Sequence, residues 1–382
     1  MSKTDKIFSK SIIFLITSLD FGGAEIQLIR LAAALKKRKW DVRIITMVLP
    51  DVSFLGLIHY DIPIYSLNMV RRKVDVCALF RLAKILRKER PTILHSHMVH
   101  ANFLARVVRL IAYVPVVVCT AHNIYEGNVI RDWWYWLTDC LCDMTTHVSK
   151  AGLRRYLDRG MVNPKKAMFI PNGVDTEVFQ DNSEIRQQIR TALNAEHRFV
   201  WLAIGRFEEA KDYPNMINAF ARVCDEKIDS ILWIAGDGFL KSKIERLVGK
   251  LGINNKVRFL GIRQDIPNLM NAADAYVMSS AWEGMPMVLL EAASCSLPIV
   301  ATSVGDNREI VKEGKTGFLV PFGNSKKLAD AMVTVEKLPI EKRYEIGQAG
   351  RKFVEEAYSL EYIVDKWENL YRQLMPNRRF SL

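Results

Sequence analysis

Two carboxylates in the C-terminal half have the spacing of a ligand site. Glu283 and Glu291 lie eight residues apart in the run Ser280-Ala-Trp-Glu-Gly-Met-Pro-Met-Val-Leu-Leu-Glu-Ala292. A helix that begins near Met287 would separate them by about two turns, so both side chains can face one site. The backbone N–H groups of its first turn lack partners within the helix and can hold a diphosphate or sugar hydroxyls. We assign this backbone role to Met285, Pro286, Met287 and Val288.

A cationic pair lies further towards the N-terminus. Arg206 and Lys211 belong to the run Ile204-Gly-Arg-Phe-Glu-Glu-Ala-Lys-Asp212, which follows a β-rich segment. A guanidinium fork and a compact ammonium together suit a diphosphate leaving group, whose developing charge must be neutralised. Taken alone, the two residues are more simply explained as ordinary surface charges.

Three histidines crowd the end of another β-rich segment. His97 and His100 have the i, i+3 spacing of a metal-binding helix face, but no cysteine or carboxylate lies close to them in the sequence. We therefore predict no metal site. The preferred interpretations are that His97 lines a substrate cleft and that His95 makes local hydrogen bonds.

The elements that must position these residues alternate between β-rich and helical patterns. Such alternation predicts parallel βαβ units with helices on both faces of each sheet. Strands are expected at 12–17, 42–48, 92–95, 116–120, 199–203, 230–235, 257–260, 275–278 and 299–301. Helices are expected at 24–39, 78–87, 101–111, 214–222 and 360–374. Two such sheets in succession imply a crevice where the carboxyl ends of their strands face each other.

The chain length of 382 residues suits two domains. The pattern restarts after a hinge-like stretch over residues 171–194. We predict an N-terminal α/β domain at 1–178, a C-terminal α/β domain at 179–358, and a last segment at 359–382 whose helix crosses back to the first domain.

The net charge of +12 is unevenly distributed. Residues 1–178 hold 26 Lys+Arg against 15 Asp+Glu, whereas the remainder holds 28 against 27. A basic first half indicates an anionic partner, such as an anionic membrane surface. No nucleic-acid-binding module is recognisable, so nucleic acid is not predicted. The six cysteines form no CxxC pair and are predicted to be buried free thiols.

Two apolar segments have alternative interpretations. Lys6 and Lys10 precede an apolar run at 11–17 that faintly resembles a secretory signal, but a buried first strand is favoured. The run Arg131-Asp-Trp-Trp-Tyr-Trp136 can lie at a membrane interface or fill a domain core, and core packing is favoured. A cytoplasmic location is predicted, with docking on the inner face of the plasma membrane as an open alternative.

Several short motifs, in order along nearly the whole chain, resemble glycosyltransferase family 4. Beside the two C-terminal runs described above they are Gly22-Gly-Ala-Glu25, Thr120-Ala-His122, Val148-Ser149, Ile170-Pro-Asn-Gly-Val-Asp175, Ile234-Ala-Gly-Asp-Gly238, Phe259-Leu-Gly261 and Val300-Ala-Thr302. The resemblance implies the GT-B fold and transfer of a sugar from a nucleotide diphosphate with retention, without a metal or other cofactor.

The resemblance also implies residue roles. Arg206 and Lys211 would hold the donor diphosphate, Glu291 the ribose, and Glu283 the donor sugar. His122 would lie beside the reacting sugar. The donor would further meet the backbone at Gly22, Gly23, Ile262 and Arg263, and the acceptor side would include His97 and Glu25.

This chain departs from the family pattern at two places. Asp212 stands where many members have glycine, a change that we judge tolerable. Gly284-Met-Pro286 replaces the Phe-Gly often seen with GDP-mannose donors, which favours a UDP-sugar. The expected acceptor is a lipid-linked saccharide of bacterial surface polysaccharide synthesis. The alternatives are a sugar phosphorylase, a nucleotide-sugar epimerase, or a non-catalytic sugar-nucleotide-binding scaffold.

Overall fold

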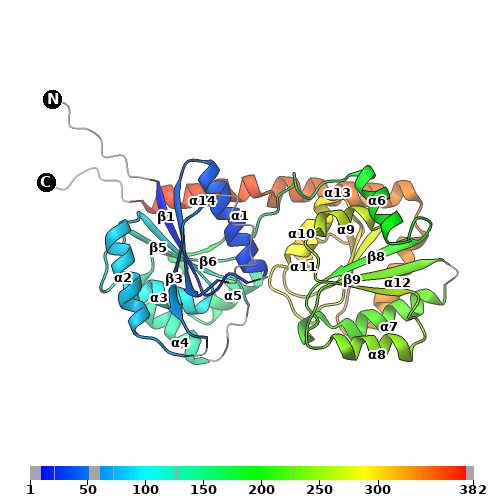
Figure 1. Ribbon diagram of the computed structural model, residues 1–382, viewed down its shortest axis with the longest axis horizontal. Coiled ribbons are helices and arrows are strands. Elements are labelled where there is room, and N and C mark those ends of the chain that lie inside the picture. The colour runs from blue at the N-terminus through cyan, green and yellow to red at the C-terminus, as the bar shows by residue number, and fades with distance from the viewer. Residues whose placement is uncertain are drawn as a thin grey trace. The chain divides into compact units, whose positions relative to one another are not determined.

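The computed structural model describes residues 10–20, 22–50, 61–71, 73–124, 127, 129–226 and 228–375, and the chain forms two compact units (Figure 1). Unit 1 comprises Met1–Gly173 with Leu360–Leu382, and unit 2 comprises Val174–Ser359. The boundaries thus fall at Val174 and Leu360 rather than at 179 and 359. Lys6 lies outside the described residues.

Unit 1 is built on a seven-stranded parallel sheet of order β3-β2-β1-β4-β5-β6-β7. Its strands are β1 (Ser11–Ile16), β2 (Asp41–Val48), β3 (Ile64–Met69), β4 (Ile93–His97), β5 (Val116–Ala121), β6 (Met144–His147) and β7 (Ala167–Phe169). Its α-helices are α1 (Gly23–Lys37), α2 (Cys77–Glu89), α3 (Val99–Val108), α4 (Val129–Thr138), α5 (Lys150–Asp158) and α14 (Leu360–Leu374).

Both faces of this sheet are covered, which is why its central strands read as unbroken apolar runs. Helices α1 and α14 pack over one face, where Ile12, Phe14 and Trp367 share a core. Helices α2 and α3 pack over the other face, with Ile13 and Leu15. The alternating direction of successive β1 side chains explains how one strand feeds both cores.

Unit 2 is built on a six-stranded parallel sheet of order β10-β9-β8-β11-β12-β13. Its strands are β8 (Phe199–Ile204), β9 (Ser230–Ala235), β10 (Val257–Gly261), β11 (Ala275–Met278), β12 (Ile299–Thr302) and β13 (Gly317–Val320). Helices α7 (Tyr213–Cys224), α8 (Lys241–Lys250) and α12 (Ser325–Lys337) share one core with the sheet. The other α-helices are α6 (Ser183–Ala192), α9 (Ile266–Ala272), α10 (Met287–Ser294), α11 (Asn307–Ile310) and α13 (Ile340–Tyr358).

The predicted hinge at 171–194 is wrong over part of its length, because it contains α6. Asn182 caps this helix by accepting a hydrogen bond from the Ile185 N–H. Arg186 and Arg190 then donate to the carbonyls of Asn271 and Ala272 respectively. Arg190 is the buried residue of this helix, so its sequence does not show the apolar face of a typical core helix.

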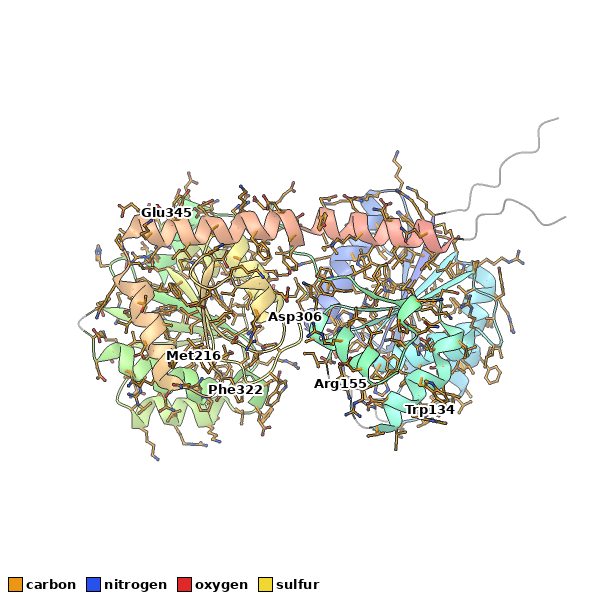
Figure 2. All side chains as sticks on the ribbon, turned by 180° about the vertical axis from the view of Figure 1, so that it is seen from behind. Trp134, Arg155, Met216, Asp306, Phe322 and Glu345 are labelled. Carbon is orange, nitrogen blue, oxygen red and sulfur yellow. The ribbon has the colours of Figure 1, made fainter. Side chains whose placement is uncertain are left out.

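The prediction of core packing for the aromatic run in α4 is also wrong for its tryptophans. Trp133, Trp134 and Trp136 are 52%, 44% and 59% exposed, and only Tyr135 of the four aromatic residues is buried. Figure 2 labels Trp134 on the surface of unit 1. The apolar side of this helix therefore faces solvent.

All six cysteines are free thiols, but Cys77 and Cys140 are exposed rather than buried as predicted. Across the described residues, no helix combines the length and the apolar character needed to cross a membrane.

Candidate active site

The strand order of unit 2 reverses between β8 and β11, and the predicted cationic and acidic runs follow these two strands. In doubly wound sheets, ligands bind at the carboxyl ends of the strands where the order reverses. Lys211 and Glu283 meet at this point, with Lys211 Nζ 2.6 Å from Glu283 Oε1. The Ser280 hydroxyl donates to the same carboxylate oxygen at 2.6 Å. Both charged side chains are mostly buried, so their mutual attraction is screened less than at an open surface.

Contacts between the loops hold this pair in place. The Ser279 hydroxyl is 2.8 Å from the carbonyl oxygen of Lys211. The Ala281 N–H donates to the carbonyl of Ala210 at 2.8 Å. The Thr302 hydroxyl donates to the Ser280 carbonyl at 2.6 Å, which attaches the loop to the end of β12. Ser280 was not predicted as a site residue, and its only sequence signal is a hydroxyl three positions before Glu283.

The backbone next to Glu283 also packs against a glycine. Gly305 has φ +50°, and a Cβ there would overlap the Glu283 carbonyl oxygen. The Asp306 N–H donates to the Gly284 carbonyl at 3.1 Å. Only a residue without a side chain fits this approach, so position 305 helps to fix the carboxylate loop.

Asp212 departs from the glycine of many family members, and the structure supplies a reason why both residues suit this position. Its φ is +43°, in the left-handed region that glycine adopts freely and that aspartate tolerates better than most residues. Its side chain also caps α7 by accepting from the Asn215 N–H. The expectation that aspartate is tolerable here is consistent with this geometry.

Arg206 lies in the loop after β8, but its side chain is not joined to the Lys211–Glu283 pair by any described contact. It is 71% exposed and forms an ion pair with Glu208 at 3.1 Å. A long exposed guanidinium can reorient when an anion binds, so its assignment to the diphosphate stays a prediction.

Helix α10 begins at Met287 as predicted and carries Glu291, which is buried. Pro286 is the N-cap residue and has no N–H, so the predicted use of backbone N–H groups cannot include it. Met285, Met287 and Val288 retain N–H groups. The anion site assigned to this helix start is correspondingly smaller than predicted from the sequence.

The predicted nucleobase contacts follow β10. Ile262 is 69% exposed, and the Arg263 guanidinium makes two hydrogen bonds of 2.7 and 2.6 Å to the Asp265 carboxylate. This interaction raises the pKa of Arg263. The Gly261 carbonyl accepts from the Gly236 N–H at 2.8 Å, which joins the ends of β10 and β9. The contact of the nucleobase with the backbone at Ile262 and Arg263 stays a prediction.

The strand order of unit 1 reverses between β1 and β4. Gly22 precedes α1 in an extended conformation, and Gly23 is its first residue. A Cβ on Gly22 would overlap the carboxylate of Glu25, so this glycine also makes room for a side chain of its own helix. Glu25 is buried, and its predicted place on the acceptor side stays a prediction.

His97 is the last residue of β4 and His122 follows β5, and the structure brings them together. His97 Nδ1 lies 2.9 Å from His122 Nε2. His97 is only 2% exposed and lies against His122, and its predicted place lining a cleft stays a prediction. His95 bonds Tyr371 Oη and Thr120 Oγ1, each at 2.7 Å, which confirms its predicted local hydrogen-bonding role.

Burial keeps these imidazoles neutral. Desolvation, reinforced by the nearby His147, lowers the pKa of His122 to about 3, although its ring retains partial access to solvent. Desolvation also lowers the pKa of His147 to about 4. Neutral imidazoles can accept and donate hydrogen bonds at neutral pH, but they contribute no positive charge.

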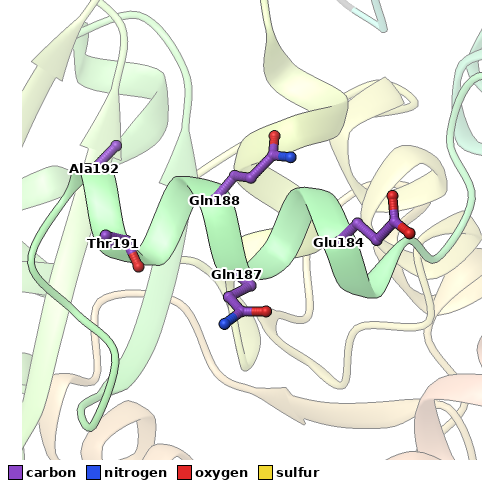
Figure 3. A pocket seen from close by; sticks show the side chains of 5 residues that line it. All are labelled: Glu184, Gln187, Gln188, Thr191 and Ala192. Atoms are coloured by element: carbon purple, nitrogen blue, oxygen red, sulfur yellow. The ribbon is translucent and has the colours of Figure 1, made fainter.

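Within the described residues, no cluster of three or more His, Cys, Asp or Glu side chains is arranged to hold a metal ion. A shallow hollow lies along α6 (Figure 3), lined by Glu184, Gln187, Gln188, Thr191 and Ala192. None of these residues is cationic, so this hollow does not suit a diphosphate.

Comparisons with known proteins agree with this arrangement. The profile of the family described as Glycosyl transferases group 1 matches residues 184–353, and that of Glycosyltransferase Family 4 matches residues 21–178. The putative glycosyltransferase EpsD of Bacillus subtilis is 32% identical over 294 residues, covering 72% of this chain and 75% of EpsD.

An Escherichia coli UDP-Gal:α-D-GlcNAc-diphosphoundecaprenol α-1,3-galactosyltransferase is 28% identical over 318 residues, covering 80% of this chain and 81% of the relative. The crystal structure of HepE from Anabaena in complex with UDP-glucose has 22% sequence identity and a TM-score of 0.82, covering 95% of this chain and 99% of HepE. This likeness shows the GT-B fold predicted from the sequence. The chain belongs to glycosyltransferase family 4, and it is a glycosyltransferase of two Rossmann-like units.

Proposed function

We propose that this glycosyltransferase moves a sugar from a UDP-sugar to a lipid-linked saccharide, with retention of the anomeric configuration and without a metal ion. The observation that carries the proposal is the Lys211–Glu283 pair at the reversal point of unit 2. An ammonium for the diphosphate and a carboxylate for sugar hydroxyls lie side by side, as transfer from a sugar nucleotide requires.

The choice of UDP has two supports. Gly284-Met-Pro286 replaces the pattern associated with GDP-mannose. In addition, HepE was crystallised with UDP-glucose, and the name of the Escherichia coli relative specifies UDP-Gal. That same name specifies a diphosphoundecaprenol-linked acceptor, which supports a lipid-linked acceptor for this chain.

In the proposed reaction, the acceptor hydroxyl attacks the anomeric carbon from the face that the diphosphate leaves. The bond from the anomeric carbon to the β-phosphate oxygen breaks, and that oxygen takes the proton of the attacking hydroxyl. Lys211 and Arg206 stabilise the charge that develops on the diphosphate. His122, as a neutral imidazole, orients the reacting sugar through a hydrogen bond.

The deciding experiment screens UDP-, GDP- and ADP-sugars for thermal stabilisation and then assays transfer to polyprenyl-diphosphate-linked saccharides. We expect stabilisation by a UDP-sugar, UDP release that depends on the acceptor, and a product with the anomeric configuration of the donor by NMR. Turnover should persist in EDTA. Orthophosphate-dependent breakdown of a glucan, epimerisation without transfer, or binding without turnover would each replace this proposal with one of the alternatives.

A further inference from the structure

Helix α4 of unit 1 presents an apolar surface that the proposed reaction does not use. Within its ten residues, the strongly exposed ones are Val129, Ile130, Trp133, Trp134, Trp136 and Leu137, and we call these six the outer face of α4. At about 100° per residue they form one continuous arc of about 160° around the helix. No charged or polar residue interrupts this arc.

The polar residues of α4 point towards unit 1 instead. Arg106 donates to the Tyr135 carbonyl at 2.9 Å and to the Thr138 hydroxyl at 3.1 Å. The amide of Asn102 donates to the Tyr135 hydroxyl at 3.0 Å. Asp132 forms an ion pair with Arg155 at 3.1 Å. The helix is therefore firmly anchored with its polar side inward, and its outer face is not a loosely packed segment of core.

Three exposed tryptophans on one helix indicate a surface that contacts another molecule. Exposed apolar patches on a folded protein commonly mark protein or membrane contacts. Tryptophan combines a large apolar ring with one N–H donor, so it is suited to the boundary between lipid chains and headgroups.

Charge around α4 selects among the possible occupants. The adjacent helix α5 carries Lys150, Arg154 and Arg155 together with Asp158, and Arg159 follows it with a side chain that is 54% exposed. Asp132 of α4 pairs with both Arg155 and Arg159, so four cations stand against two carboxylates in this region. Residues 1–178 as a whole hold 26 Lys+Arg against 15 Asp+Glu. A second copy would bring this excess positive charge against itself, whereas an anionic bilayer attracts it.

We infer that the outer face of α4 inserts into the headgroup region of an anionic bilayer and docks unit 1 on the membrane. The inference deepens the proposed function and rests on it, because a lipid-linked acceptor resides in that bilayer. Insertion adds an apolar contribution to electrostatic attraction, and salt screens only the electrostatic part.

The test uses the full chain and vesicles of equimolar phosphatidylcholine and phosphatidylglycerol. The triple variant Trp133→Gln, Trp134→Gln, Trp136→Gln is compared with a control, Ile340→Gln with Tyr344→Ser, which changes exposed apolar residues on α13 of unit 2. We expect the triple variant to bind the vesicles at least about tenfold more weakly than the wild type. The control should bind as the wild type does. At high salt the wild type should retain residual binding that the triple variant lacks. Brominated lipids should quench the tryptophan fluorescence of the wild type more strongly than that of the triple variant.

Equal vesicle binding by the triple variant and the wild type would overturn the inference. So would an absence of wild-type binding, or light scattering that shows a dimer which the tryptophan changes dissociate. Thermal stabilisation by nucleotide sugars, measured without vesicles, keeps the two proposals separate. The triple variant should retain that stabilisation, whereas its absence in the wild type would refute the proposed donor chemistry whatever the vesicles show.

Discussion

The reversal points of the two sheets have the same topology but different electrostatics. In unit 2 a lysine and a glutamate form an ion pair at 2.6 Å. In unit 1 His97 ends β4 at the reversal point, and His122 follows the next strand, β5. Their imidazoles are neutral, with His97 Nδ1 2.9 Å from His122 Nε2. Parallel-sheet topology therefore places ligand-facing loops at one edge, and the residues in those loops decide whether the edge is charged.

The difference suits two tasks. A diphosphate needs opposing charge, whereas a neutral imidazole can orient a sugar through a hydrogen bond without attracting the diphosphate. Substitutions that act on one edge and not on the other test this division.

The largest effect is expected for Lys211→Ala. Loss of the ammonium that opposes the leaving diphosphate should reduce kcat/KM about 10³-fold, or roughly 4 kcal/mol. Steady-state release of nucleoside diphosphate measures it, with the exposed Lys327→Ala as the control. Turnover equal to that of the wild type would remove Lys211 from its assigned role.

Acid should destabilise unit 1 through its histidines. The folded-state pKa of His147 is lowered to about 4 from 6.5. Between these values the unfolded chain binds a proton that the folded chain does not, so stability present above pH 6.5 declines towards pH 4, by about 3 kcal/mol for this group. Hydrogen exchange of β4–β6 measures the decline, and His147→Gln should make it shallower. An opening free energy of β4–β6 that does not change with pH, after correction for the intrinsic exchange rate, would contradict the prediction.

His122→Ala tests the uncharged edge. We expect kcat to fall about 10²-fold while the dissociation constant of the donor changes little, because the imidazole acts on the reacting sugar rather than on the diphosphate. The matched control is His197→Ala, at an exposed position of unit 2. A comparable loss of donor affinity would show that both edges bind the diphosphate.

Gly305→Ala tests the backbone that fixes Glu283. Strain from a positive φ combined with overlap of the Glu283 carbonyl should destabilise unit 2 by about 2 kcal/mol or more. Gly323 has φ +66°, and a Cβ added there would meet no atom within 4 Å, so Gly323→Ala isolates the strain alone at about 1 kcal/mol. Equal losses in urea unfolding would show that the carboxylate loop can move away.

The smallest effect is expected for Asp212→Gly. Glycine relieves the left-handed strain but loses the cap of α7, so the free energy of unfolding should change by less than about 1 kcal/mol. Calorimetry measures the change. The control is Asn215→Ala, which removes the Asn215 side chain but keeps the backbone N–H that Asp212 caps. A loss of several kcal/mol would show that the Asp212 side chain makes a larger contribution.

Sequence patterns predicted the elements with strong apolar runs or periodicity. The bounds of β9, β11 and α14 match the expected ranges. The short strand β7 has only three residues and was missed, as were β3, β6 and β13. Such strands gain their stability from neighbouring strands, so their own sequences carry a weak signal.

Periodicity could not predict which side of α4 faces inward. A helix with one apolar arc normally buries that arc, but here Arg106 and Asn102 bind the opposite side. Likewise, the motifs indicated that Lys211 and Glu283 share a site, but only the structure shows that Glu283 contacts both Lys211 and Ser280. Side-chain partners that are distant in sequence require tertiary information.

The ion pair at the edge of unit 2 has a consequence for selectivity in the cell. A bare phosphate that approaches Lys211 must compete with the Glu283 carboxylate for the same ammonium, and that carboxylate also repels it. A sugar nucleotide can compensate by offering hydroxyl donors to Glu283 while its diphosphate takes the lysine. We therefore expect the pair to discriminate against inorganic phosphate and to favour a ligand that carries hydroxyl donors beside its diphosphate.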